Sequence, residues 1–167
     1  MIKRKDSEPP APSPRWASEH LDQEDGTMIT REGSAHWEGG LKDGEGRVST
    51  QSGALTDQPY GFRNRFEDAP GTNPEELIGA AHAACFSMAL SMMLEQAGIT
   101  GTVVDTRSAI SMDKDGDGFT ITRAHLTTTI RGDGDRAQIE ELAQKAKDGC
   151  PVSKLLNAEV TMDATVG

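Results

Sequence analysis

The chain has 167 residues, of which 35% are hydrophobic and only 4% aromatic, so it suits one domain with a core of mainly aliphatic side chains. Its 27 acidic and 17 basic residues give a formal net charge of −10, which excludes nucleic acid and anionic membrane as main partners because both would repel it. Such a thin core favours burial against a second copy of the chain.

Residues 1–27 are predicted to form a flexible arm, and residues 28–167 the folded domain. The arm holds four of the eight prolines and many charges, with few apolar side chains to offset the entropy of ordering. An acidic, proline-rich stretch follows the basic start where a secretory signal would have an apolar segment. We therefore expect a cytoplasmic, reducing location, where a long-lived structural disulfide is disfavoured.

Short strands separated by glycine-rich turns are predicted at residues 35–38 and 47–50. A third strand is predicted at residues 60–66, where aromatic side chains alternate with Arg63 and Arg65. In an extended chain this alternation would place both arginines on one face.

The clearest helix signal spans residues 74–96. Asn73 is a good N-cap, Glu76 can complete the cap, and Gly98 provides a stop. Residues 77–94 carry no charge and are long enough to span a membrane, but many are small or polar and the neighbouring strands are amphipathic. We therefore predict a buried central helix.

The second half of the chain continues with two extended runs at residues 102–112 and 119–130. A helix at 136–147, a short helical piece through Leu156 and a closing strand at 158–166 follow, so the whole order predicts an α+β domain. The acidic turn at 113–118 is similar to half of a calcium loop, yet Ala124 stands where that loop needs its final glutamate. It is predicted to be a solvated hairpin turn.

The two cysteines, Cys85 and Cys150, are 65 positions apart. Alone, Cys85 in the middle of a buried helix would be an inert thiol with a high pKa. Cys150 precedes Pro151 at the predicted start of a short helix, where N–H groups stabilise a thiolate and suit a resolving role. His82 and Cys85 could form half of a zinc site, but the sequence offers no clear full ligand set, so we expect neither metal nor cofactor.

Four segments together resemble the OsmC/Ohr family of osmotically inducible and organic hydroperoxide resistance proteins, and its OsmC branch in particular. The signature helix corresponds to residues 73–90, NPEELIGAAHAACFSMAL. The other segments are residues 35–39 (AHWEG), 58–62 (QPYGF) with 65–67 (RFE), and 145–153 (KAKDGCPVS). The resemblance runs from about residue 30 to the C-terminus and excludes the arm.

This resemblance implies an OsmC-like fold of antiparallel sheets around a long central helix, and a thiol peroxidase that reduces organic hydroperoxides to alcohols. It implies that Cys85 is the peroxidatic thiol, which becomes a sulfenic acid, and that Cys150 resolves it as a disulfide recycled by an external dithiol of the lipoyl type. Arg65 and Glu75 match the family's catalytic arginine and glutamate. Arg63 and Glu76 lie close enough in sequence to be confused with them.

Elementary geometry adds a prediction about assembly. Ten helical residues rise about 15 Å, so Glu75 is too far to serve Cys85 of its own chain. We therefore expect an intertwined homodimer in which Arg65 and Glu75 act on the cysteine of the other copy. Phe62, Phe86, Met88 and Met92 are predicted to line the pocket for bulky hydroperoxides.

Two other functions fit the same residues. The first is a non-catalytic binding or structural stress protein with the same fold. The second is a dithiol–disulfide oxidoreductase acting on protein thiols, which the absence of a Cys-x-x-Cys pair disfavours.

Overall fold

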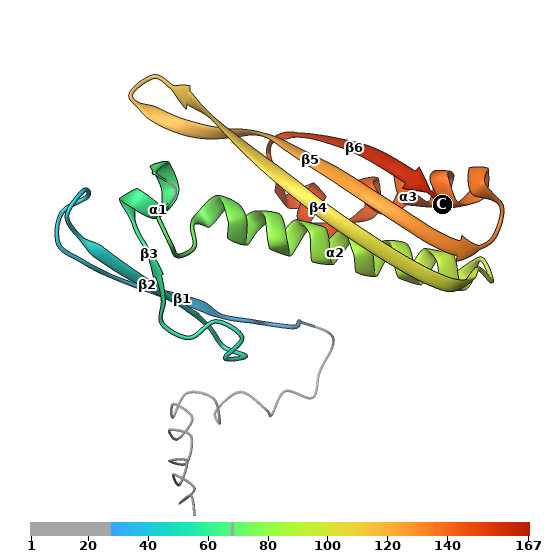
Figure 1. The fold of residues 1–167 in the computed structure, drawn as a ribbon, viewed down its shortest axis with the longest axis horizontal. Helices are drawn as coiled ribbons and strands as arrows, with labels where there is room; N and C mark the ends of the chain where they lie inside the picture. Colours follow the sequence, from blue (N-terminus) through green and yellow to red (C-terminus); the bar gives the residue numbers. More distant parts are fainter. Residues whose placement is uncertain (1–27, 68) are drawn as a thin grey trace, which may run out of the picture.

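A computed structural model describes residues 28–67 and 69–167, so the predicted arm lies outside the described part of the chain. The elements form two groups (Figure 1). A small sheet and a short helix come first, and a larger group of one long helix, three strands and two further helices follows.

The first sheet is antiparallel, in the order β1 (Gly33–Glu38), β2 (Glu45–Thr50), β3 (Gln58–Tyr60). The strands predicted at 35–38 and 47–50 are confirmed. Trp37 and Tyr60 pack across it with ring centroids 5.7 Å apart, over Gly46, where a Cβ would collide with both rings. Every residue of β1 is exposed.

The predicted strand at 60–66 is wrong, because the chain leaves β3 at Tyr60 and forms the short helix α1 (Phe62–Phe66). The alternating aromatic residues that indicated a strand also stand four apart, which places them on one side of a helix. Phe62 and Phe66 stack with ring centroids 4.8 Å apart, and Phe66 packs 5.6 Å from Phe119. Aromatic packing with a distant strand therefore decided between the two structures.

The long helix α2 (Pro74–Gln96) is confirmed with both of its signals. The Asn73 side chain accepts the N–H of Glu76 at 2.9 Å, and Gly98 takes a positive φ of 75° just beyond the helix. One face of α2 is buried and is formed by residues at helical spacing: Gly79, His82, Phe86, Leu90 and Leu94.

The prediction of a buried central helix is confirmed for one side of α2. Met88 and Met92 lie on the other side, 74% and 51% exposed. By length and composition α2 could cross a membrane, yet its buried face packs against β4 (Thr100–Asp115) and α3 (Arg136–Gly149). The helix thus has one apolar face in a core and another that residues 28–67 and 69–167 leave exposed.

The second sheet has the order β4, β5 (Gly118–Asp133), β6 (Glu159–Val166). β4 and β5 form a long antiparallel hairpin, as expected, but β6 runs parallel to β5, so this sheet is mixed. The chain crosses over between β5 and β6 through α3 and α4 (Pro151–Leu155), and such a crossover allows parallel pairing. The core lies between this sheet and the helices α2 and α3.

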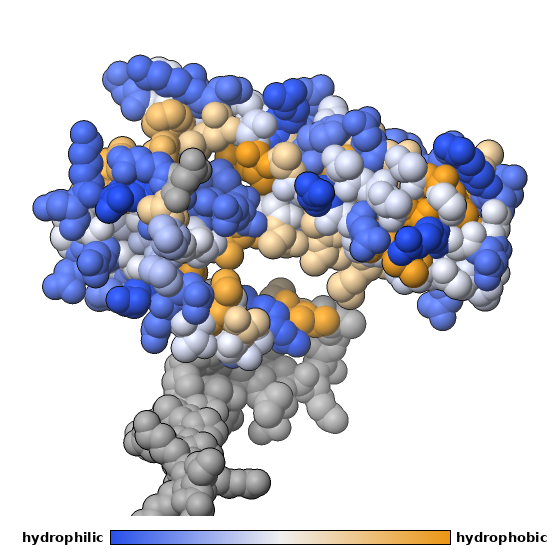
Figure 2. Space-filling view, viewed as in Figure 1, coloured by the Kyte–Doolittle hydropathy of each residue, from blue (hydrophilic) through white to orange (hydrophobic). Residues whose placement is uncertain are grey.

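An open gap separates the first sheet from the middle of α2 (Figure 2). Moderately hydrophobic residues of the helix border the gap from one side. Within the described part of the chain, the exposed strand β1 and the exposed apolar side of α2 thus offer surface for a further contact.

Candidate active site

The two cysteines meet where α4 begins against α2. Cys150 immediately precedes α4 and is fully buried, whereas Cys85 is partly exposed in the middle of α2. Each thiol shifts the pKa of the other, which places the two side chains close together although 65 positions separate them in sequence. This proximity is compatible with a disulfide.

The surroundings of the two sulfur atoms differ. Burial raises the pKa of the Cys85 thiol, and its hydrogen bond to Cys150 raises this pKa further. Burial also acts to raise the pKa of Cys150, but the bond from Cys85, the hydroxyl of Ser153 and the N–H groups of Val152 and Ser153 outweigh it and lower the pKa. Within one chain, Cys150 is thus the readier thiolate and Cys85 keeps its proton.

Arg65 and Glu75 form the second part of the candidate site. Arg65 Nε lies 3.1 Å from both carboxylate oxygens of Glu75, and Nη2 lies 2.6 Å from Oε1. Arg65 Nη2 also donates to the sulfur of Met112 at 3.2 Å. These bonds hold the guanidinium in one orientation.

The helical turn of α1 separates Arg65 from Arg63. Arg63 pairs with Glu67 at 3.2 Å, and its side chain is 73% exposed. Glu76 is exposed, and its backbone N–H is bound by the N-cap. Arg65 and Glu75 are thus the arginine and glutamate that lie together.

The four predicted residues form two half-sites in one chain. Glu75 and Cys85 lie ten residues apart in the continuous helix α2, which corresponds to about 15 Å of rise. The structure brings Cys85 to Cys150 and Arg65 to Glu75, and it keeps the two pairs apart.

An aromatic cluster lies beside the Arg65 half-site. It consists of Phe62, Phe66 and Phe119, and the Arg65 guanidinium carbon is 5.5 Å from the centre of the Phe66 ring. Phe119 was missed because only the length of the β4–β5 hairpin brings it here. The prediction of Phe86 as a pocket residue is wrong, since its side chain is fully buried in the core.

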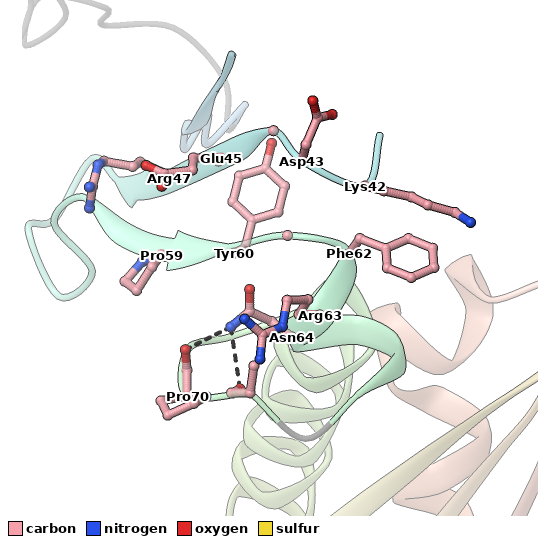
Figure 3. Close-up of a pocket in the computed structure, with 14 residues that line it drawn as sticks. Lys42, Asp43, Glu45, Arg47, Pro59, Tyr60, Phe62, Arg63, Asn64 and Pro70 are labelled. Carbon is pink, nitrogen blue, oxygen red and sulfur yellow. Dashed lines mark hydrogen bonds between the residues drawn. The ribbon is translucent and has the colours of Figure 1, made fainter. Parts of the chain in front are cut away.

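A separate polar hollow of about 600 Å³ lies between β2, β3 and α1 (Figure 3). Lys42, Arg47 and Tyr60 line it, and Asn64 beside them donates to the carbonyl of Pro70 at 2.7 Å. Neither cysteine borders this hollow.

His82 hydrogen-bonds to two serines, whereas its spacing from Cys85 indicated half of a zinc site. Both of its ring nitrogens are occupied by serine hydroxyls, from Ser108 at 2.8 Å and Ser153 at 2.9 Å. Across residues 28–67 and 69–167, no three His, Cys, Asp or Glu side chains are grouped so that they could hold a metal ion. The two serines were missed because neither spacing nor motif links them to His82.

The fold and the site together define an α+β domain with paired thiols between a central helix and a short C-terminal one. Residues 66–165 match the family described as OsmC-like protein. The chain is 57% identical over 136 residues to Peroxiredoxin OsmC of Escherichia coli (strain K12), which covers 81% of this chain and 95% of that protein.

Two further comparisons agree with this match. The chain is 29% identical over 116 residues to the Organic hydroperoxide resistance protein OhrB of Bacillus subtilis (strain 168), covering 69% of this chain and 84% of that protein. The crystal structure of OhrB from Bacillus subtilis superposes with a TM-score of 0.60 at 27% identity, covering 84% of this chain and all of that one. The chain belongs to the OsmC-like family, which confirms the resemblance.

Proposed function

We propose that the protein is a thiol peroxidase that reduces organic hydroperoxides to alcohols in the cytoplasm. The observation that carries this proposal is the proximity of the Cys85 and Cys150 thiols at the junction of α2 and α4, which supports a reversible disulfide between them. The names of the relatives, a peroxiredoxin and a hydroperoxide resistance protein, support the same chemistry.

The reaction follows from the two thiols. The Cys85 thiolate attacks one peroxide oxygen, an S–O bond forms, the O–O bond breaks, and the leaving alkoxide takes up a proton to become the alcohol. The Cys150 thiolate then attacks the sulfenic sulfur of Cys85, the disulfide forms, and the hydroxide released becomes water with a proton. An external dithiol of the lipoyl type reduces the disulfide and is itself oxidised to a cyclic disulfide.

A guanidinium beside Cys85 favours this order of events, because within one chain burial and the neighbouring Cys150 raise the pKa of the Cys85 thiol. In the proposed site, Arg65 favours the Cys85 thiolate, binds the peroxide oxygen and stabilises charge on the leaving alkoxide. Glu75 holds the guanidinium fork through the bonds already described.

A second copy of the chain supplies that guanidinium in our proposal. About 15 Å of helix separates the two half-sites, so Arg65 and Glu75 of one copy would meet Cys85 of the other in an intertwined homodimer. The exposed Met88 and Met92 face of α2 offers an apolar surface for this contact. The aromatic cluster beside Arg65 would then hold the organic part of the hydroperoxide.

A dithiol-coupled assay tests the proposal. Dihydrolipoamide, lipoamide dehydrogenase and NADH are combined with cumene hydroperoxide or with hydrogen peroxide, and the oxidation of NADH is followed. We expect faster turnover of cumene hydroperoxide, none with Cys85→Ser, and little with Cys150→Ser. Peptide mapping after one equivalent of peroxide should detect the Cys85–Cys150 disulfide.

The same assay separates the alternatives. Absence of turnover by the unmodified protein would favour a binding or structural protein. Activity that survives Cys85→Ser would reject the proposed peroxidatic thiol. Reduction of protein disulfides without peroxide turnover would favour a dithiol–disulfide oxidoreductase.

A further inference from the structure

A row of hydrogen bonds on the buried face of α2 ends at the proposed resolving thiol. His82 is fully buried, its Nδ1 is 2.8 Å from Ser108 Oγ, and its Nε2 is 2.9 Å from Ser153 Oγ. The Ser153 hydroxyl in turn lies beside the Cys150 thiol and lowers its pKa. The row Ser108–His82–Ser153–Cys150 thus connects four side chains, and the proposed mechanism uses only the last of them.

Rigid elements hold each member of the row. Ser108 lies on β4, His82 on α2, and Ser153 in the first turn of α4, three residues after Cys150. Gly79 allows this proximity, because a Cβ there would lie 2.7 Å from the backbone oxygen of Ser108. The row therefore depends on the close approach of α2 to β4.

Ser153 differs from the other groups around the Cys150 sulfur because it contributes a side-chain hydroxyl. The groups that face Cys150 are the Cys85 thiol from α2, and the Val152 and Ser153 N–H groups with the Ser153 hydroxyl from α4. The neighbouring charges of α3, Lys147 and Asp148, pair with each other at 3.5 Å. Ser153 thus supplies the side-chain hydroxyl among the groups that stabilise a thiolate here.

A neutral His82 ring couples the directions of the hydrogen bonds on its two sides. Burial lowers the pKa of His82, so its ring is neutral and carries one N–H. If Ser153 donates its hydroxyl proton to Cys150, the Ser153 oxygen accepts from Nε2–H, and Nδ1 accepts from the Ser108 hydroxyl. The opposite tautomer would turn the Ser153 hydroxyl toward His82 and away from the sulfur.

We propose that His82 is a positioning residue for Cys150: its Nε2–H, donated to the Ser153 oxygen, keeps the Ser153 hydroxyl donating to the Cys150 sulfur. This inference rests on the proposed function, since it concerns the step in which Cys150 resolves the Cys85 sulfenate. In that step the Cys150 thiolate forms the S–S bond and the S–O bond breaks, with loss of hydroxide. His82 contacts neither sulfenate nor peroxide in this role and acts through Ser153.

Removing the row should make Cys150 a weaker acid. Loss of a hydrogen bond to the charged sulfur should raise the thiolate midpoint by about one pH unit or more. At a pH below the midpoint, raising the midpoint by one pH unit lowers the fraction of Cys150 present as thiolate about tenfold. It also makes each thiolate about threefold more nucleophilic, so the resolving step should slow roughly threefold.

Two measurements test this. The first titrates thiolate absorbance at 240 nm in a Cys85→Ser background, where Cys150 is the one remaining cysteine of the sequence. The second mixes the intact pair with one equivalent of cumene hydroperoxide, quenches at intervals with dimedone and a thiol blocker, and counts sulfenate and disulfide by mass spectrometry. The first reports the acidity of Cys150, and the second separates its step from the oxidation of Cys85.

We expect His82→Leu and Ser153→Ala to raise the midpoint, slow disulfide formation and accumulate dimedone adducts, with Cys85 oxidation unchanged. His82→Gln, whose amide N–H can replace Nε2–H, and Ser153→Thr, which keeps the hydroxyl, should recover both readouts. Ser87→Ala is the matched control, because it removes a 3.0 Å bond to Thr106 elsewhere on α2. It should change neither readout.

Normal titration and normal resolution in His82→Leu, or failure of His82→Gln to recover either, would overturn the inference. If His82→Leu does not fold, the comparison of Ser153→Ala with Ser153→Thr and of His82→Gln with the unmodified protein still decides. Failure of the proposed function looks different, because the unmodified protein would then form no sulfenate at Cys85, while the titration of Cys150 would still report on His82.

Discussion

At the scale of single residues, the two arginines of α1 are a natural pair for comparison. Both belong to the same short helix, but Arg65 is fixed by Glu75 and Met112, whereas Arg63 is solvent-exposed and pairs with Glu67. The sequence alone did not separate the two arginines, because they stand two positions apart between similar aromatic residues.

Arg65→Lys should lower kcat/KM for cumene hydroperoxide roughly 10²-fold, because lysine cannot reproduce the guanidinium fork at the leaving oxygen. The matched variant Arg63→Lys should change it by about twofold at most, since an exposed ion pair contributes little. The coupled peroxidase assay measures both. Equal losses in the two variants would contradict the assignment of Arg65.

His82 should also make stability depend on pH. Its pKa is lowered from 6.5 in the folded protein, so below that value the unfolded chain binds the proton and the folded chain does not. Stability should therefore fall as the pH drops through 6.5, with a slope of up to about 1.4 kcal/mol per pH unit from this one group.

Urea unfolding of His82→Gln at fixed protein concentration should show a smaller fall over the same range. His36→Gln serves as the control, because the His36 side chain is 72% exposed and should leave the slope unchanged. An equal pH slope in the unmodified protein and in His82→Gln would show that His82 is not the acid-sensitive group.

At the scale of elements, local signals predicted α2 and the β4–β5 hairpin because both are determined by neighbours in sequence. The cap at Asn73, the stop at Gly98 and the alternating strands need no distant contact. The short helix α1 was not predicted because the contact that favours it, between Phe66 and Phe119, joins residues more than fifty positions apart. Parallel pairing of β6 was likewise unpredictable from its alternation alone.

The candidate site divides in the same way. The motif resemblance indicated the cysteines, Arg65 and Glu75, and the structure places them in two pairs. The row through His82 had no sequence signal, because its serines come from β4 and α4, at positions 26 and 71 residues away. Its existence depends on how closely α2 approaches β4.

Gly79→Ala tests that approach. In an open helix the change would stabilise by about 1 kcal/mol, but here the new Cβ would meet the Ser108 backbone oxygen at 2.7 Å. Overpacking a core costs about 1–3 kcal/mol, so after the helix gain we expect net destabilisation of up to about 2 kcal/mol in urea unfolding at fixed protein concentration. A gain of about 1 kcal/mol would mean that β4 moves at no cost.

At the scale of the whole molecule, the exposed apolar face of α2 offers a contact surface through which a second copy could bring a guanidinium to Cys85. The exposed Met88 and Met92 face of α2 follows Cys85 along the helix, and the guanidinium needed at Cys85 lies at the other end of α2. A single chain therefore has all four groups of the proposed site and cannot assemble them, whereas two antiparallel copies could.

Mixing two inactive variants distinguishes a composite site from a site within one chain. Cys85→Ser and Arg65→Lys chains, co-expressed with different tags, should recover activity in the mixed dimer, where one site combines the intact Cys85 of one copy with the intact Arg65 of the other. Random pairing makes half of the dimers mixed with one complete site each, so about a quarter of the unmodified activity should return. The control mixes Cys85→Ser with Cys150→Ser, which should stay inactive because these thiols pair within one chain. Recovery in the control, or none in the Arg65 mixture once mixed dimers have been isolated by their two tags, would contradict the proposed exchange.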